Sequence, residues 1–402
     1  MNSTRLQPRG SSQGGLRQYN ERVVLQAIRL HGPLPGAEIA RLTQLTAQTV
    51  SMITKRLLAD GLLARGAPLR GKVGQPSVPL SLAPDGAYAI GIQVGRRSLD
   101  VLLVDFAGAV RQRWSLGYRN PEPAALLAEI ALRLRQINTI LGPKGRGQLQ
   151  GVGIAAPQSL GGWRHLLGFP PRLADAWAGT DLRAEVARLT PLPVALIKDT
   201  AAACVAELVA GRGRDVKTFL YVFVDTFIGG GLVIDSHLRA GAQGNAGAIG
   251  SMPLGLASAR GAAPAQLLAV ASLFGLEQRY GQAGLDSAAA SDARALDAPW
   301  LRHTTAWLRE AAAAIALAVN SAACLLDLDQ VIVDGSFSRE LLAALQAALD
   351  DALARYDWQG VQRPQVQAGT IGADARALGG ALLPLYANFA PDRDLFLKIA
   401  AE

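Results

Sequence analysis

The first sixty residues follow the hydrophobic pattern of three short amphipathic helices. In QYNERVVLQAIRLHG (18–32) the apolar side chains recur every 3.6 residues, and Gly32 and Pro33 end the helix; these side chains are Val23, Val24, Ala27, Ile28 and Leu30. Two further patterns, GAEIARLTQLT (36–46) and LTAQTVSMITKRLLADG (45–61), meet at a short connection around Leu45 and Thr46. Their predicted buried positions are Ile39, Ala40 and Leu42, then Val50, Ile53 and Leu57. This spacing predicts a helix-turn-helix, whose second helix enters the DNA major groove.

The second helix of this motif would present to DNA the side chains that are not in its buried face. These are Gln48, Thr49, Ser51, Met52, Lys55 and Arg56. Glutamine can form two hydrogen bonds to adenine, threonine can contact a phosphate or a thymine methyl group, and lysine and arginine suit the phosphate backbone. Residues 62–82 then follow the pattern of strand, basic Gly/Pro turn and strand, which predicts a wing that carries Arg65, Arg70 and Lys72. The alternative is a three-helix bundle with a structural role only.

From Ala87 onward the pattern changes to short apolar runs that are typical of β-strands. YAIGIQVGRRSLDVLLVDFAGAV (88–110) contains two such runs around a turn, which predicts a β-hairpin that opens a new domain. More apolar runs alternate with helical stretches; they lie at 149–155, 194–197, 219–224, 231–234 and 330–333. The large part of the chain is therefore predicted to be α/β, with a mixed sheet.

Length and composition are typical of a folded protein with more than one domain. At 402 residues the chain exceeds one core of ordinary size, so we expect two or three domains. Residues 1–16 are polar and Gly/Ser-rich and lack the apolar stretch of a secretory signal, so we interpret them as a flexible arm. The apolar stretch 311–326 is shorter than the roughly 20 residues that span a bilayer, and we predict a buried helix rather than a membrane contact. With only Cys204 and Cys324 present, no disulfide framework is expected, which favours a reducing cytoplasm.

The formal net charge of +8 is concentrated at one end of the chain. Residues 1–82 contain eleven Lys and Arg against three Asp and Glu, which accounts for the whole net charge. The remaining 320 residues hold equal numbers of basic and acidic side chains. A basic module attached to a neutral body is the charge distribution expected of a nucleic-acid-binding protein. A solubilising basic surface is the other interpretation of the charge alone.

A series of motifs in the large part of the chain resembles the ROK family of repressors, unassigned frames and kinases. In order they are GQP (74–76), GVGIAAP (151–157), KDTAAACVAE (198–207), DTFIGGG (225–231), NAGAIGS (245–251), VIVDGS (331–336) and IGADARALGGAL (371–382). The resemblance implies a two-lobed, actin-like (ribonuclease-H-like) domain at 83–402, after the winged helix-turn-helix at 17–82. Lobe 1 would span about 83–195 with a C-terminal helix at about 383–402, and lobe 2 about 196–382.

The nucleotide site that the resemblance implies is altered at three places. Sugar kinases of this fold open with a strand that ends in an acidic residue, followed by Gly-Gly-Thr, where Gln93, Val94, Gly95, Arg96 and Arg97 stand here. The change removes a magnesium anchor and crowds a phosphate-binding loop, although arginine can itself bind phosphate. Solvated side chains are the simpler interpretation of the two arginines. Asp225 replaces a glycine in the second phosphate turn, and Asp334 replaces one of two paired glycines on the adenosine side.

The sugar site that the resemblance implies is altered differently. Lys198 and Asp199 stand where the family has Asn-Asp, and Asp199, the base in the kinases, is retained. Ala248 and Ser251 replace a glutamate and a histidine that hold sugar hydroxyls. We name Lys198, Asp199, Asn245 and Ser251 as candidate effector contacts. The segment LGLASARGAAPAQ replaces a cysteine-rich zinc motif and contains no Cys or His, so no metal or other cofactor is expected.

Three interpretations of the altered sugar pocket remain open. In the first, Lys198 and Asp199 form an internal ion pair; in the second, the pocket favours an anionic ligand such as a sugar acid or sugar phosphate; in the third, no small molecule binds. Together these patterns predict a cytoplasmic DNA-binding regulator that is not an enzyme. We expect a repressor of carbohydrate-related genes that binds operator DNA as a homodimer or homotetramer and responds to a small carbohydrate. The alternatives are an ATP-dependent sugar kinase, or a DNA-binding protein without effector whose large domain serves for oligomerisation.

Overall fold

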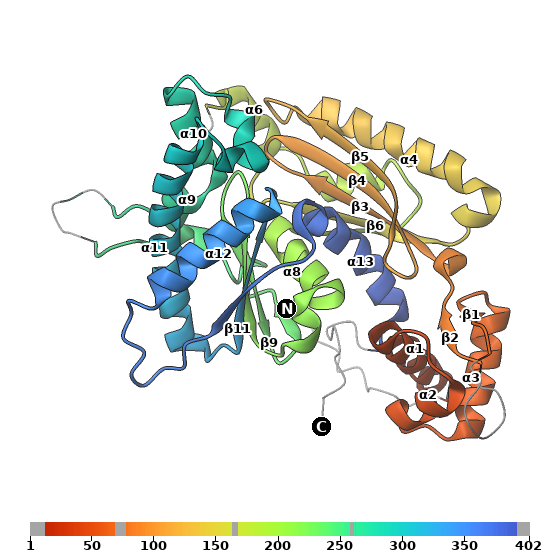
Figure 1. The fold of residues 1–402 in the computed structure, drawn as a ribbon. Helices are drawn as coiled ribbons and strands as arrows, with labels where there is room; N and C mark the ends of the chain where they lie inside the picture. Colours follow the sequence, from red (N-terminus) through yellow and green to blue (C-terminus); the bar gives the residue numbers. More distant parts are fainter. Residues whose placement is uncertain (1–12, 69–77, 163–167, 258–260, 262, 392–402) are drawn as a thin grey trace, which may run out of the picture.

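The computed structural model describes residues 13–68, 78–162, 168–257, 261 and 263–391. An N-terminal helical module lies beside a large domain with two lobes, and each lobe is built on a five-stranded sheet (Figure 1). This arrangement confirms the predicted fold class, a winged helix-turn-helix followed by a two-lobed α/β domain.

The N-terminal module contains three helices and a two-stranded sheet. They are α1 (Gln13–His31), α2 (Gly36–Thr43), α3 (Ala47–Ala59), β1 (Leu63–Arg65) and β2 (Leu80–Leu82). Gln44, in the left-handed conformation with φ of 55°, turns the chain between α2 and α3, and the Thr46 hydroxyl caps α3 by accepting the N–H of Thr49. β1 and β2 pair in antiparallel fashion as the two strands of the predicted wing. Helix α1 begins within the predicted arm, since it starts at Gln13.

Burial in this module follows the hydrophobic pattern in α3 and only partly in the other two helices, since Ala40 and Leu42 of α2 and Val23 and Leu30 of α1 are half-buried. Val50, Ile53 and Leu57 of α3 are buried, and Ile39 of α2 is fully enclosed. In α1, Leu25 and Gln26 are buried in addition to the expected positions Val24, Ala27 and Ile28. The second buried face of α1 packs on the large domain, which a periodicity within the module does not reveal.

The first lobe is built on a mixed sheet of order β5-β4-β3-β6-β7. Its strands are β3 (Tyr88–Val94), β4 (Ser98–Asp105), β5 (Val110–Gly117), β6 (Leu149–Ala156) and β7 (Val194–Lys198). The first three strands are antiparallel, and β6 and β7 continue the sheet in parallel. Helix α4 (Pro123–Arg146) covers one face, and α6 (Pro171–Ala178) and α7 (Leu182–Ala187) lie between β6 and β7 in the chain (Figure 1).

The second lobe repeats the connectivity of the first. Its strands are β8 (Phe219–Val224), β9 (Gly229–Ile234), β10 (His237–Arg239), β11 (Gln330–Gly335) and β12 (Gln365–Ala368). They are ordered β10-β9-β8-β11-β12, again with three antiparallel strands followed by two parallel ones. The two lobes therefore share one topology, as a ribonuclease-H-like fold in two copies requires.

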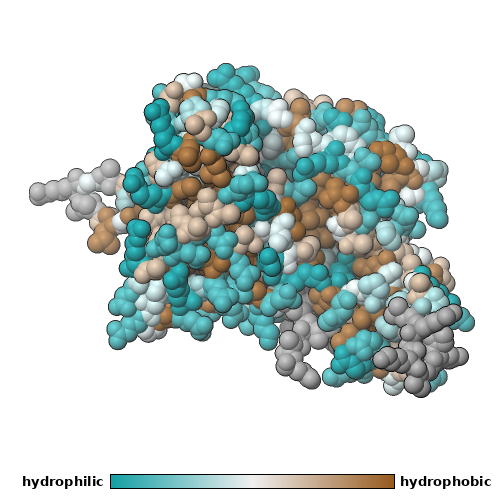
Figure 2. Space-filling view, viewed as in Figure 1, coloured by the Kyte–Doolittle hydropathy of each residue, from teal (hydrophilic) through white to brown (hydrophobic). Residues whose placement is uncertain are grey.

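The outer helices of the second lobe include one long apolar helix, α11. These helices are α9 (Leu267–Ala271), α10 (Leu273–Gln282), α11 (Leu301–Leu326) and α12 (Arg339–Leu353). In the described part of the chain, α11 alone has the length and hydropathy of a membrane-crossing helix, yet half of its apolar window is buried. Trp307, Ile315 and Val319 of α11 belong to the core of this lobe. The face shown in Figure 2 is mostly hydrophilic, with smaller hydrophobic patches.

Two helices, α8 (Asp199–Ala210) and α13 (Ala375–Phe389), pack against each other between the two sheets (Figure 1). Glycine makes this close approach possible: a Cβ on Gly379 would overlap the carbonyl oxygen of Ala202 in α8. A Cβ on Gly153 of β6 would likewise overlap the carbonyl oxygen of Gly380. The lobe bounds differ slightly from those predicted, because β7 of the first sheet runs to Lys198 and the C-terminal helix begins at Ala375.

Helix α13 also joins the large domain to the N-terminal module. The guanidinium of Arg29 in α1 lies over the rings of Phe106 and Tyr386, with its Cζ 5.1 and 5.6 Å from the two ring centres. Arg214 of the second lobe donates to the carbonyl oxygen of Leu30 near the end of α1. Residues of α1, β4, α8 and α13 form one continuous hydrophobic core, so the module is packed onto the domain.

Candidate DNA-binding and effector sites

The predicted DNA-contacting face of α3 is open to solvent. Gln48, Ser51, Met52 and Lys55 are exposed, and Met52 retains 62% of its accessible surface. Thr49 is half-buried, and its hydroxyl lies 2.8 Å from that of Thr46. A helix whose opposite side is buried in the module core and whose outer face carries polar side chains has the geometry of a recognition helix.

Two of the predicted basic contacts occupy different surroundings. Arg56 lies 3.2 Å from the Glu21 carboxylate of α1 and 3.7 Å from that of Asp60, so it helps to hold α3 on α1 while remaining partly exposed. Arg65 is exposed at the end of β1. The predicted wing residues Arg70 and Lys72, and the GQP motif at 74–76, lie outside the described residues.

The four predicted effector residues line one cavity between the lobes, although they are far apart in the chain. Lys198 and Asp199 come from the junction of β7 and α8, Asn245 from the loop after β10, and Ser251 from a short 3-10 helix (Ile249–Ser251). The cavity has a volume of about 240 Å³. This is below the roughly 300–1,000 Å³ of pockets for drug-sized ligands, and it suits a small molecule such as a monosaccharide.

Lys198 and Asp199 do not form the ion pair that was the simpler interpretation of their sequence. Among the described residues, no carboxylate lies within 4.0 Å of the Lys198 amine. Burial lowers the pKa of Lys198, and the nearby Asp199 charge only partly opposes this shift. Asp199 is buried, and its Oδ1 accepts the N–H of Thr200 at 2.8 Å. The two side chains therefore present opposite charges to the cavity separately.

Arg96 is part of this cavity wall, which the sequence did not indicate. Its Nη2 donates to the Ser159 carbonyl oxygen at 3.3 Å, and its guanidinium lies 5.0 Å from the centre of the Phe227 ring. The side chain reaches from the first lobe to the second and is not freely solvated, which corrects our interpretation of this residue. The sequence placed Arg96 in the altered phosphate turn, but it gave no signal that the side chain reaches this cavity, because its contact with Phe227 depends on the second lobe.

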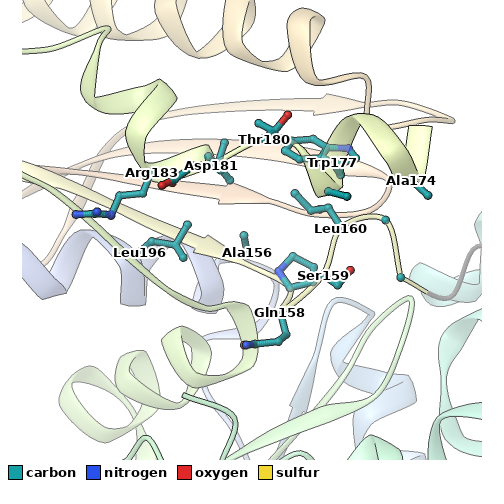
Figure 3. A pocket seen from close by; sticks show the side chains of 15 residues that line it. Ala156, Gln158, Ser159, Leu160, Ala174, Trp177, Thr180, Asp181, Arg183 and Leu196 are labelled. Carbon is teal, nitrogen blue, oxygen red and sulfur yellow. The ribbon is translucent and has the colours of Figure 1, made fainter. Parts of the chain in front are cut away.

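A larger cavity of about 480 Å³ adjoins the candidate effector cavity, the one lined by Lys198, Asp199, Asn245 and Ser251. Pro157, Gln158 and Ser159, in the loop that follows β6, line both. Figure 3 shows this second cavity between that loop and the segments that carry Trp177, Asp181 and Arg183. A ligand larger than a monosaccharide would have room to extend past Gln158 toward these helices.

Salt bridges and hydrogen bonds occupy the region where the resemblance implies nucleotide phosphates. Arg97 forms two hydrogen bonds to the Glu277 carboxylate of α10, at 2.6 and 2.8 Å, and donates to the Thr226 hydroxyl at 3.1 Å. These contacts tie the β3–β4 turn to the second lobe. The Gln93 amide, in the orientation that satisfies its neighbours, donates to Asp100 at 2.8 Å and accepts the Gly95 N–H at 3.0 Å. Arg97 is thus an interlobe contact, not the solvated side chain that we expected.

The second phosphate turn is blocked by an internal ion pair. Asp225 pairs with Arg376 of α13, and Arg376 also donates to the Ser336 hydroxyl at 3.2 Å. The space that remains beside these side chains and Thr226 measures about 20 Å³. A cavity of that size holds about one water molecule. In this arrangement of the lobes there is no room there for a phosphoryl group.

Two buried carboxylates in the recognised motifs hold the start of α13. Glu207 of α8 accepts the backbone N–H groups of Thr370, Ile371 and Arg212, and burial nevertheless raises its pKa. Asp334 accepts the N–H of Gly372 at 2.7 Å and pairs with Arg339 at 2.9 Å. Asp334 therefore has a structural role here in the place of the missing glycine.

A sequence profile described as the ROK family matches residues 89–386, about three quarters of the chain. A second profile, described as the MarR family, matches residues 18–71, which include α2 and α3. The first match covers both lobes, and the second covers most of the helical module. The two matches therefore do not overlap: one covers the large domain, and the other the N-terminal module.

Curated relatives with regulatory names resemble part of the chain. A putative xylose repressor from Caldicellulosiruptor sp. (strain Rt8B.4) is 26% identical over 60% of this chain and 59% of its own length. The xylose repressor of Bacillus subtilis (strain 168) is 24% identical over 60% and 61%. A transcriptional regulator of Mycobacterium bovis, Mb0495, is 30% identical over 58% and 52%. The chain thus spans about half to three fifths of the length of these relatives.

Solved structures share the fold at low sequence identity. A ROK family transcriptional regulator, described as a homologue of the E. coli MLC protein, superimposes with a TM-score of 0.65 at 19% identity and covers 93% of this chain and 98% of its own. A ROK family glucokinase from Streptomyces griseus, in complex with glucose and AMPPNP, has a TM-score of 0.57 at 22% identity and covers 74% and 99%. The regulator match extends over the helical module, and the kinase match does not reach as far.

Proposed function

We propose that this chain, which belongs to the ROK family, is a DNA-binding transcriptional repressor that responds to a small carbohydrate and has no kinase activity. The observation that carries the proposal is the exposed face of α3. Gln48, Ser51, Met52 and Lys55 face solvent on a helix that is capped, buried on its other side and placed after a tight turn. Residues 1–82, which include this helix, also carry the entire net positive charge of the chain.

Carbohydrate sensing is supported by the cavity between the lobes. Asp199, Asn245 and Ser251 offer it a carboxylate, an amide and a hydroxyl, and such groups bind sugar hydroxyls through directed hydrogen bonds. Two of the relatives are named for xylose, and that name describes those proteins. For this chain we propose a small carbohydrate or sugar-acid effector without choosing the sugar.

Helix α13 offers a physical connection between the effector cavity and the DNA-binding module. Near its start, Arg376 pairs with Asp225 beside the cavity, and near its end Tyr386 stacks with Arg29 of α1. An effector can change DNA affinity only if it favours one lobe arrangement over another. We propose that a change in the angle between the lobes moves α13, and that α1 moves with it.

Operator recognition is tested by selecting DNA from a random pool with the full-length protein. We expect enrichment of an inverted repeat whose half-sites lie about one helical turn apart, because we propose a homodimer or a homotetramer of such dimers. Recovery of unrelated sequences, bound no better than bulk DNA, would contradict the proposal. Enrichment of a single half-site would support sequence-specific DNA binding but contradict binding as a dimer.

The absence of kinase activity is tested with a coupled assay of ADP release and a panel of sugars. We expect turnover no higher than that of Asp199→Asn, because Arg97, Glu277, Asp225 and Arg376 occupy the phosphate region. ATP-dependent turnover that disappears in Asp199→Asn would favour the alternative, a sugar kinase. Its supporting features are the retained Asp199 and the Thr226 turn.

The proposal also includes the cellular location of the protein and its membrane and metal partners. We place the protein in the cytoplasm, where operator DNA is found, and we propose no membrane partner because α11 packs into the second lobe. The side chains that could bind a metal do not form a site for one: among the described residues, no three His, Cys, Asp or Glu side chains come together.

The alternative function is a constitutive DNA-binding protein without effector. In that case, ligands would leave the affinity for operator DNA unchanged.

A further inference from the structure

The effector cavity carries one more basic than acidic side chain. Lys198 and Arg96 line it, and Asp199 is the one carboxylate among its lining residues. The other nearby carboxylate, Asp225, lies outside this lining and is paired with Arg376. The cavity therefore has an excess positive charge that the described residues do not neutralise.

The Lys198 amine lies at the cavity and forms no ion pair within 4.0 Å with a described carboxylate, although the charge of Asp199 acts on it. The backbone on either side of it is fixed by β7 and the start of α8. Partial burial removes some of the water that would otherwise stabilise its charge. An anion bound in the cavity would supply the missing countercharge.

Arg96 is fixed in place with unused donor capacity. Its Nη2 contacts the Ser159 carbonyl oxygen, and the Phe227 ring lies against its guanidinium. Its Nε is buried and, within the described part of the chain, has no hydrogen-bond partner. A guanidinium that is already oriented is well suited to bind the two oxygens of a carboxylate or phosphate.

From these three observations we infer that the effector is a small carbohydrate that carries one anionic group, a carboxylate or a phosphate ester, bound between Lys198 and Arg96. Asn245, Ser251 and Gln158 remain for the hydroxyl groups, and Asp199 accepts from one of them. The volume of about 240 Å³ limits the part bound here to about one sugar ring with its anionic group. The inference rests on the proposed function, since it specifies the ligand of the proposed effector cavity.

Calorimetric titration of the full-length protein with matched ligands tests the inference. The probes are glucose, mannose, N-acetylglucosamine and xylose, each compared with its phosphate esters and with its uronic or aldonic acid. We expect at least one charged member to bind at least about tenfold more tightly than its neutral parent, as hydrogen bonds to charged groups imply. The phosphate and carboxylate members distinguish the two sources of negative charge.

Two variants connect such a preference to this cavity. Lys198→Gln should weaken binding of the charged member at least about tenfold and leave the neutral parent nearly unchanged, because only the charged ligand uses the ammonium group. Lys217→Gln, which removes the same charge from an exposed site outside the cavity, should bind like the unchanged protein. Thermal melting of both variants shows that they are folded.

Several outcomes would overturn the inference. Equal or tighter binding of neutral sugars would do so, as would a charge preference that Lys198→Gln retains, or a panel in which no member binds. Operator affinity measured alongside separates this failure from that of the proposed function. If a neutral sugar binds and alters operator affinity, the proposed function stands and the inference fails; if sequence-specific DNA binding is absent, the proposed function itself fails.

Discussion

Lys55→Glu is expected to lower operator affinity at least about 100-fold at moderate salt. Lys55 is exposed on the outer face of α3, in line with Gln48 and Met52. Loss of a lysine contact to phosphate weakens binding to every sequence and lowers its salt dependence, and a dimer loses two such contacts. The introduced carboxylate adds repulsion from the phosphates. The measurement is a fluorescence titration of the selected operator with the full-length variant.

Lys144→Glu is the matched control for this charge reversal. Lys144 is an exposed lysine near the end of α4 in the first lobe; it lies near Asp85 and belongs neither to α3 nor to the wing strands. The two variants have the same net charge, so a general effect of charge would weaken both equally. A loss confined to Lys55→Glu, together with a smaller dependence of affinity on salt, supports contact with DNA by α3. If Lys55→Glu binds the operator with unchanged affinity, α3 is not the recognition helix.

The sequence predicted those elements whose burial is decided within a few residues. The 3.6-residue pattern identified Val50, Ile53 and Leu57 as the buried face of α3, and the structure buries all three. Continuous apolar runs likewise marked β6 and β8, because both strands lie in the interior of their sheets. Local periodicity is sufficient where one face of an element meets one core.

Three of the four edge strands of the two large sheets were missed for a physical reason, namely β5, β10 and β12, whereas the apolar run of the fourth, β7, was recognised. Nearly all residues of β5 are exposed, so its sequence VRQRWSLG has neither an apolar run nor a clear alternation. The short strands β10 and β12 are also edge strands. An edge strand is defined by hydrogen bonds to its neighbour, which leave little trace in the hydrophobic pattern.

The candidate site was predicted in part, because motifs report residues but not their distant partners. The motif order indicated Lys198, Asp199, Asn245 and Ser251, and these residues line one cavity. The partner of Asp225 was not indicated, since Arg376 lies 151 positions later and only the packing of α13 brings it near. The roles of Arg96 and Arg97 depend in the same way on the second lobe.

The close packing of α13 leads to the second large effect: Gly379→Ala is expected to destabilise the protein. At an open helical position, alanine is about 0.8–1 kcal/mol more favourable than glycine. At Gly379 the added methyl group would overlap the carbonyl oxygen of Ala202, so α13 and α8 must move apart. Overpacking of a core costs about 1–3 kcal/mol and occasionally more. We expect a net loss near the upper end, about 3 kcal/mol.

Gly275→Ala in α10 is the matched control, because the same substitution in a helix causes no overlap there. The nearest atom to its added Cβ is the Ala269 carbonyl oxygen at 3.8 Å. Thermal melting should show Gly275→Ala unchanged or more stable, and Gly379→Ala melting roughly 6–12 °C lower, from about 2–4 °C per kcal/mol in large domains. Because α13 holds Arg29 of α1 through Tyr386, the loosened variant should also bind its operator more weakly. Equal melting temperatures for the two variants would mean that α13 and α8 are not in close contact in solution.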